Sequence, residues 1–232
     1  MTVTAKKASP WRTRGQGSDD REVKREAVLR TAAQVFNEKG FHATSLDEIA
    51  DRLGVTKPTL YYYIKSKDDI LFECVRIGLK MMQDGIEESR AAGGSPVEQL
   101  CASMRIYTRI VTMDFGMCLI RIGEDPLPPE NRKELRRLKR AIDLEFRRLI
   151  ELGIASGALA PCDPKLAAFT LAGALSWIGR WYRSDGQYTP EQISDQSIAV
   201  LLHGVVRRDD AAPSPILPSA AVPSKACRDE GG

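Results

Sequence analysis

Apolar residues recur with helical spacing along most of the chain, and the clearest case lies between residues 45 and 63. Leu46, Ile49, Ala50 and Leu53 stand at positions i, i+3, i+4 and i+7, so they share one face of a helix. The positions between them are mostly charged. This pattern predicts a short amphipathic helix with one buried side.

Capping residues set the limits of this helix and of the next one. Ser45 and Glu48 have the spacing of a capping box, which predicts a helix start at Ser45. Gly54 can adopt the left-handed conformation that ends a helix. Thr56 as N-cap, followed by Pro58 in the first turn, predicts a second short helix after a brief turn. Two short helices joined in this way are typical of a helix-turn-helix.

The outer face of the second helix carries polar and aromatic groups. With Leu60 and Ile64 pointing inward, the residues expected outside are Lys57, Thr59, Tyr61, Tyr62 and Tyr63. Lysine and hydroxyl groups bond phosphate oxygens, and tyrosine rings can contact thymine methyls and base edges in the major groove. The pattern therefore favours a DNA-reading surface. The alternative is a surface helix that packs on another domain.

The rest of the chain predicts further helices and no strand, so the expected fold class is all-α. Helices are expected over residues 20–39, 67–92, 95–111, 115–122, 130–152, 164–183 and 190–206, separated by glycine and proline. Residues 20–66 would form an N-terminal three-helix helix-turn-helix DNA-binding domain. Residues 67–207 would form a C-terminal helical ligand-binding and dimerisation domain.

The two ends differ in composition from the helical part. Residues 1–19 form a basic arm that we expect to be disordered; it could follow the phosphate backbone or enter a minor groove, or serve only as a solubilising tail. Residues 208–232, rich in alanine, proline and serine, predict a disordered tail.

Composition speaks against several function classes. The net charge is only +3, and the five cysteines are widely spaced without a Cys-x-x-Cys pair, which favours reduced cytosolic thiols. With two histidines and no Cys/His cluster we expect no metal site, no cofactor and no catalytic residues. The longest uncharged stretch, residues 166–179, is too short to span a membrane. These features predict a cytoplasmic binding protein, not an enzyme.

The stretch from Ala27 to Leu71 resembles the DNA-binding domain of the TetR/AcrR family of bacterial transcriptional regulators. The resemblance is carried by Phe36 with Gly40 and Phe41, by residues 44–50 and by residues 60–67. It implies phosphate or base contacts from Thr44, Ser45, Lys57, Thr59, Tyr61, Tyr62 and Lys67. Position 58 is proline where many relatives have glycine, which puts a close backbone contact with a base there in doubt.

The last two predicted helices are the expected dimer contact. Residues 164–183 contain many small side chains, which let another helix approach closely, with tryptophan and leucine between them. In the family, this helix and the one over residues 190–206 meet their symmetry mates as a four-helix bundle, and the two heads read a palindromic operator in double-stranded DNA. The alternative is an ordinary core hairpin in a monomer.

The segment from Ser176 to Val205 resembles the C-terminal helices of family members that regulate fatty-acid and steroid catabolism, several of which respond to acyl-CoA thioesters. Methionines and aromatic rings inside the body could line a pocket, although plain core packing is the alternative, and arginines could hold the CoA phosphates. The ligand-contact candidates are Met104, Tyr107, Phe115, Met117, Arg147, Arg148, Trp177, Arg180 and Trp181.

Together these features predict a ligand-responsive, homodimeric transcriptional repressor that leaves its operator when a small-molecule effector binds, with an acyl-CoA as the candidate effector. Such a protein would be bacterial and cytoplasmic, and associated with the nucleoid when it is bound to DNA. The open alternatives are a DNA-binding regulator without an effector and a repressor with an apolar, non-CoA ligand. Activation in place of repression is also open.

Overall fold

The computed structural model of the protein describes residues 18–204, and over this range the chain forms helices and no strands. The predicted tail, and the predicted arm up to residue 17, lie outside the described residues. The helices are α1 (Ser18–Lys39), α2 (Leu46–Leu53), α3 (Lys57–Tyr61), α4 (Lys67–Ala92), α5 (Pro96–Val111), α6 (Asp114–Arg121), α7 (Pro129–Ala155), α8 (Pro164–Trp181) and α9 (Pro190–His203).

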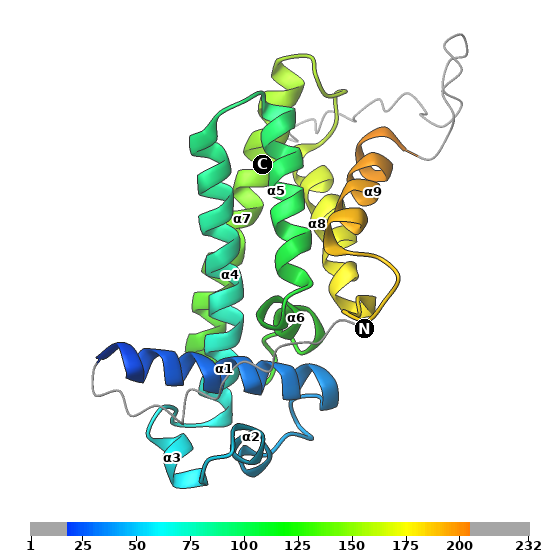
Figure 1. The fold of residues 1–232 in the computed structure, drawn as a ribbon. Helices are drawn as coiled ribbons and strands as arrows, with labels where there is room; N and C mark the ends of the chain where they lie inside the picture. Colours follow the sequence, from blue (N-terminus) through cyan, green and yellow to red (C-terminus); the bar gives the residue numbers. More distant parts are fainter. Residues whose placement is uncertain (1–17, 205–232) are drawn as a thin grey trace, which may run out of the picture.

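The helices form a small head and a longer body (Figure 1). In the head, α1 lies across the base of the body, with α2 and α3 beneath it. Helix α4 runs from the head up into the body, where it packs against α5, α6 and α7. Helices α8 and α9 pack against α5, and α6 fills the junction between α5 and α1. The predicted all-α class with an N-terminal helix-turn-helix is confirmed.

The caps of the helix-turn-helix lie at the predicted residues, but only some of the predicted hydrogen bonds form. The Ser45 hydroxyl accepts a hydrogen bond from the Glu48 amide at 3.1 Å, yet the Glu48 carboxylate forms an ion pair with Lys39 of α1. The predicted capping box is therefore only half formed, because an ammonium group is the stronger partner for the carboxylate. Gly54 ends α2 with φ 68° and ψ 35°, the left-handed conformation that was predicted.

Two expectations about side-chain direction and helix length are wrong. Tyr63 is half-buried and packs against the core, because the chain beyond Tyr61 is no longer α-helical and turns its side chain inward. Helix α7 continues past Gly153 to Ala155. A Cβ on Gly153 would lie 2.6 Å from Leu159 Cδ1, so this glycine allows close packing and does not end the helix.

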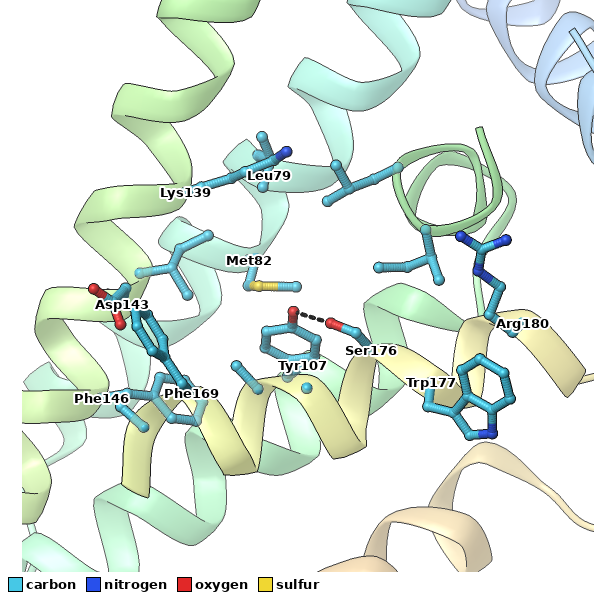
Figure 2. Close-up of a pocket in the computed structure, with 16 residues that line it drawn as sticks. Leu79, Met82, Tyr107, Lys139, Asp143, Phe146, Phe169, Ser176, Trp177 and Arg180 are labelled. Atoms are coloured by element: carbon cyan, nitrogen blue, oxygen red, sulfur yellow. Dashed lines mark hydrogen bonds between the residues drawn. The ribbon is translucent and has the colours of Figure 1, made fainter. Parts of the chain in front are cut away.

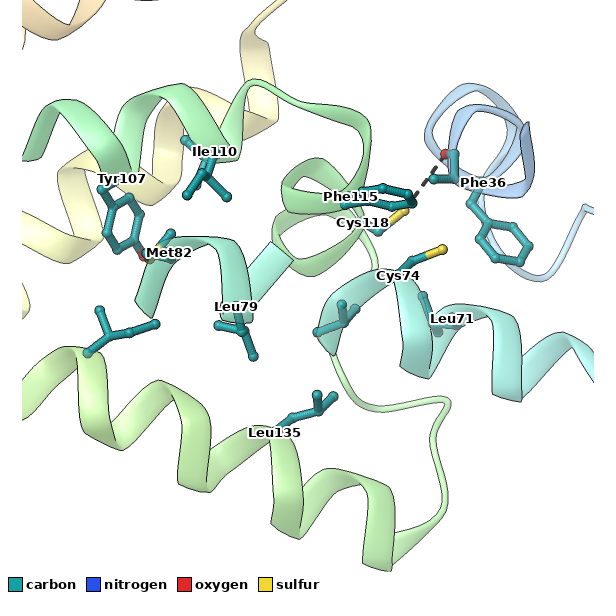
Figure 3. Packing of buried hydrophobic residues seen from close by; sticks show 14 of the residues in the cluster. Phe36, Leu71, Cys74, Leu79, Met82, Tyr107, Ile110, Phe115, Cys118 and Leu135 are labelled. Carbon is teal, nitrogen blue, oxygen red and sulfur yellow. Dashed lines mark hydrogen bonds between the residues drawn. The ribbon is translucent and has the colours of Figure 1, made fainter. Parts of the chain in front are cut away.

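A continuous apolar core connects head and body (Figure 3). Phe36 of α1 lies close to Cys74 of α4 and to Phe115 and Cys118 of α6 at the junction, and the core continues along α4 past Leu79. Helices α4 and α6 approach closely: a Cβ on Gly78 would lie 3.3 Å from the Gly116 amide nitrogen. A shift of α4 or α6 would therefore displace the residues of α1 that pack against them.

Polar contacts reinforce this junction through Arg121 at the end of α6. Its guanidinium donates hydrogen bonds to the carbonyl oxygens of Asn37 in α1, at 3.3 Å, and of Gly179 and Tyr182 at the end of α8, at 2.9 Å each. The Asn37 side chain in turn donates to the carbonyl oxygen of Asp114 at 2.8 Å. A single side chain thus joins the head, α6 and α8.

Candidate DNA-binding surface and ligand cavity

Helix α3 and the residue after it present two tyrosines to solvent. The exposed fraction is 49% for Tyr61 and 63% for Tyr62, high values for large aromatic side chains. The Arg21 guanidinium lies 5.0 Å from the centre of the Tyr62 ring, a cation–π contact from α1. The surface therefore combines aromatic faces with positive charge, the chemistry that base edges and phosphates require.

Polar groups beside the tyrosines are exposed and weakly engaged. Lys57 pairs with Asp47 of α2 at 2.9 Å, and both side chains are largely exposed. The hydroxyls of Thr59 and Thr56 lie 2.9 Å apart, and Ser45 caps α2 from an exposed position. Exposed ion pairs contribute little to stability, so an approaching phosphate could replace Asp47 as the partner of Lys57.

Two of the seven candidate DNA contacts have internal partners. The Thr44 side chain is only 3% exposed and its hydroxyl donates to the Gly40 carbonyl oxygen at 2.8 Å. The Lys67 ammonium donates to the carbonyl oxygens of Phe41 and Thr44, at 2.9 and 3.1 Å, and lies over the Phe41 ring. Both side chains hold the turn between α1 and α2 in place, so any contact that they make with DNA must accommodate these bonds.

A cavity of about 430 Å³ lies in the body between α4, α5, α6, α7 and α8 (Figure 2). This volume is in the range of small-molecule sites. Its walls are Leu79, Met82, Tyr107, Leu119, Ile120, Lys139, Ile142, Asp143, Phe146, Ala168, Phe169, Ala172, Gly173, Ser176, Trp177 and Arg180.

The inner wall of the cavity is apolar and its rim is charged or aromatic. Met82 and Phe146 are almost fully buried, whereas Phe169 and Trp177 on α8 are more than half exposed. Lys139 at the rim is paired with Glu124, while Arg180 is exposed and has no acidic partner among residues 18–204. The cavity can therefore enclose an apolar group and leave a charged group near solvent.

The inner wall contains one pair of hydroxyl groups. Tyr107 Oη and Ser176 Oγ lie 2.7 Å apart and form a hydrogen bond between α5 and α8 (Figure 2). Burial raises the pKa of Tyr107, and the bond with Ser176 only partly opposes this effect. The phenol is therefore neutral over the physiological pH range.

The structure brings three of the nine ligand-contact candidates to the cavity, namely Tyr107, Trp177 and Arg180. The other six do not line it: Met104, Phe115, Met117, Arg147, Arg148 and Trp181. Met104 is fully buried among core side chains, and Phe115 faces a separate hollow at the junction with α1. Helical spacing identified these residues as inward, but several inward directions exist in a bundle of this kind.

The two arginines of α7 are held by acidic neighbours. Arg147 forms an ion pair with Asp143 and lies 5.1 Å from the centre of the Phe169 ring, so it supports two wall residues from behind. Arg148 pairs with Glu145 at 2.7 Å on a different side of α7. Arg147 and Arg148 each follow an acidic residue by three or four positions, the spacing of a salt bridge on one helix face, and Arg180 does not. This difference in the sequence could have shown that Arg180 is the arginine left free for a ligand.

The structure also bears on metals and membranes. Over residues 18–204, no group of three or more histidine, cysteine, aspartate or glutamate side chains is placed to hold a metal ion. Within the same range, every helix is too short or too polar to cross a lipid bilayer.

The head with its exposed helix-turn-helix, and the body with its partly open cavity, define a helical DNA-binding regulator with a ligand-binding domain. Two family comparisons agree. Residues 28–74 match "Bacterial regulatory proteins, tetR family", and residues 93–205 match "Tetracyclin repressor-like, C-terminal domain". The chain belongs to the TetR/AcrR family, whose members are transcriptional regulators and not enzymes.

Individual relatives match over nearly their whole length. The transcriptional regulator PfmR from Thermus thermophilus is 30% identical with a TM-score of 0.72, covering 78% of this chain and 99% of PfmR. AibR, solved with isovaleryl coenzyme A and operator DNA, is 28% identical with a TM-score of 0.70, covering 77% and 98%. The transcriptional repressor KstR2 of Mycolicibacterium smegmatis is 24% identical over 79% of this chain and 91% of KstR2.

Proposed function

We propose that the protein is a cytoplasmic, homodimeric repressor that binds a palindromic operator and releases it when an acyl-CoA thioester enters the body. The observation that carries this proposal is the cavity itself, because its apolar inner wall opens at a rim with an exposed guanidinium, Arg180. An acyl chain fits the apolar inner wall, and a CoA phosphate fits the guanidinium at the rim. AibR, a structural neighbour, was solved with both an acyl-CoA and operator DNA.

The operator would be bound by the outer side of the helix-turn-helix. Tyr61 and Tyr62 are exposed enough to reach base edges, while Lys57, Thr59 and Ser45 lie where phosphates would approach. Thr44 and Lys67 would contribute mainly by fixing the entry to α2, given their internal bonds.

A second copy of the chain would cover the outer face of α8 and α9. Leu166 and Trp181 of α8 and Val200 of α9, which do not line the cavity, are between 47% and 64% exposed. An exposed apolar stripe of this kind favours a dimer contact.

Ligand binding would act on the DNA through α4 and α6. Helix α4 carries Leu79 and Met82 in the cavity wall and begins in the head. Helix α6 carries Leu119 and Ile120 in the wall and packs on α1. A ligand that fits only one setting of these helices shifts the population between two separations of the heads, and only one of the two matches the operator.

The direct test is a gel shift with the DNA upstream of the protein's own gene, repeated with a panel of acyl-CoAs and the corresponding free acids. We expect a retarded protein–DNA complex that dissociates in the presence of a subset of acyl-CoAs but not of the free acids. The absence of any complex would contradict the repressor proposal. A complex that no ligand dissociates would favour an effector-independent regulator. A complex that free apolar compounds dissociate would favour a non-CoA ligand.

A further inference from the structure

The hydroxyls of Tyr107 and Ser176 have hydrogen-bonding capacity that the protein does not use. Two hydroxyls carry two hydrogens, and one of these forms the 2.7 Å bond between them. Neither oxygen has another partner among residues 18–204. One donor hydrogen is therefore available at the cavity wall, and because an unsatisfied buried donor is costly, the site favours a ligand that accepts from it.

The surroundings of the pair determine what kind of acceptor fits. The Lys139 ammonium at the rim is already paired with Glu124, and the Asp143 carboxylate is paired with Arg147. Met82 and Phe146, beside the pair, are apolar and nearly fully buried. A carboxylate placed at the hydroxyls would lose its water beside these apolar side chains, and the unpaired cation of the wall, Arg180, lies one helical turn away at the exposed rim. A neutral carbonyl oxygen loses far less on transfer.

We propose that Tyr107 and Ser176 form a carbonyl-recognition pair that binds the neutral carbonyl oxygen of the effector. This inference rests on the proposed function and deepens it, because it assigns the thioester carbonyl of an acyl-CoA to one place in the cavity. The acyl chain then lies toward Met82, and the remainder of the ligand leaves past Trp177 and Arg180, which lie on the other side of Ser176 (Figure 2). A neutral-carbonyl site of this kind would favour the thioester over the free acid.

The orientation of the pair supports this role. Ser176 is on α8 one turn before Arg180, so a ligand held at its hydroxyl would present its polar part to the exposed guanidinium. Tyr107 comes from α5 and forms an edge-to-face contact with Phe146 of α7, with ring centres 6.1 Å apart. The phenol is therefore fixed by packing before the ligand arrives, which lowers the entropic cost of recognition.

The test compares two probes that differ only at the carbonyl: isovaleryl-CoA and its thioether analogue S-(3-methylbutyl)-CoA. Binding to the full chain is measured by calorimetry, and release of operator DNA by fluorescence anisotropy. We expect the thioester to bind about tenfold more tightly than the thioether. In the double variant Tyr107→Phe/Ser176→Ala, which lacks both hydroxyls, the two probes should bind equally, with thioether affinity unchanged. Tyr182→Phe changes an equally buried tyrosine outside the cavity and should keep the preference.

Each single substitution leaves one hydroxyl but removes the bond that orients it, so Tyr107→Phe and Ser176→Ala should each reduce the preference in part. If the unmodified protein binds both probes equally, the carbonyl pair is refuted while the repressor proposal stands. If the double variant keeps the full preference, the pair is also refuted. If neither probe binds, isovaleryl-CoA is refuted as the effector, and the assignment of its carbonyl to the pair falls with it.

Discussion

At the residue scale, the contacts of single side chains decide which part of the head is available to DNA. Thr44 and Lys67 carry motif positions of the family, yet both are bonded within the head. Lys57, Tyr61 and Tyr62 are exposed, with only an exposed carboxylate or a cation–π contact as partner. Position in a motif and availability to a ligand are therefore separate properties.

Lys57→Ala should weaken operator binding, and the plot of log affinity against log salt should become less steep by about one unit per protomer, as expected for one lost phosphate contact. Lys80→Ala is the matched control, because Lys80 is also an exposed lysine paired with an aspartate, Asp84, but lies on α4. Anisotropy titrations at several salt concentrations measure both. Equal effects of the two substitutions would contradict the role of Lys57.

The carboxylate of Glu73 provides a pH-dependent contact between head and body. Burial opposes its ionisation, but hydrogen bonds from Arg76 and Arg25 outweigh burial and hold its pKa below the ordinary value of 4.5. The bridge to Arg25 of α1 is 3.0 Å long. Because the pKa is lowered in the folded state, this contribution to the free energy of unfolding is present above about pH 4.5 and is lost as the pH falls through the lowered pKa.

Glu73→Gln should therefore lower the free energy of unfolding by about 1 kcal/mol at neutral pH and by progressively less as the pH falls below 4.5. Chemical denaturation of both proteins at a series of pH values measures the difference. A gap that is constant from about pH 7 down to about pH 3 would show that the carboxylate charge contributes nothing.

At the element scale, the helix limits that depend on local sequence were predicted well. The helices expected over residues 95–111 and 190–206 do start there, each at a capping box, of Ser95 with Glu98 and of Thr189 with Gln192. The partner of the Glu48 carboxylate could not be predicted from local sequence, because that partner, Lys39, belongs to another helix. Lys39 becomes a neighbour only after α1 and α2 have packed.

The cavity was predicted only in part, for a related reason. Tyr107 and Trp177 were identified from their residue types, but Leu79 and Ile142 in the wall look like any other core residue in the sequence. The direction in which each helix turns its apolar face follows from close contacts such as Gly78 against Gly116. Such contacts depend on the assembled bundle and not on the period of the pattern.

Arg121 is the side chain on which the contact between α1, α6 and α8 most depends. Arg121→Met leaves the carbonyl oxygens of Asn37, Gly179 and Tyr182 without these donors, and should lower the free energy of unfolding by about 2–4 kcal/mol. Arg109→Met, an exposed arginine of α5, should change it by less than about 0.5 kcal/mol. Urea denaturation measures both, and similar values for the two would contradict the structural role of Arg121.

At the scale of the whole molecule, the proposed dimer links two heads at a fixed separation. Val200→Glu places a charge on the exposed face of α9 and should convert the dimer to a monomer, because an unpaired carboxylate would be buried in the contact. Val23→Glu changes a similarly exposed valine of α1 and should leave the dimer intact. Sedimentation velocity distinguishes the outcomes. If the Val200→Glu protein sediments as the unmodified protein does, the dimer contact does not include this face of α9.

The continuous core and the contacts of Arg121 give the molecule a physical route for a signal from cavity to head, since α4, α6 and α8 all border the cavity and two of them pack on α1. Coupling of this kind is reciprocal by thermodynamic necessity. A ligand that weakens operator binding by a given factor must itself be bound more weakly, by the same factor, when the operator is present.

The most direct measurement is therefore the affinity of the full chain for isovaleryl-CoA, determined by calorimetry with and without saturating operator DNA, beside operator affinity with and without saturating isovaleryl-CoA. We predict that both affinities fall by the same factor, between about 5-fold and 150-fold. Isovaleryl-CoA binding that is unaffected by the operator would contradict a ligand-controlled repressor.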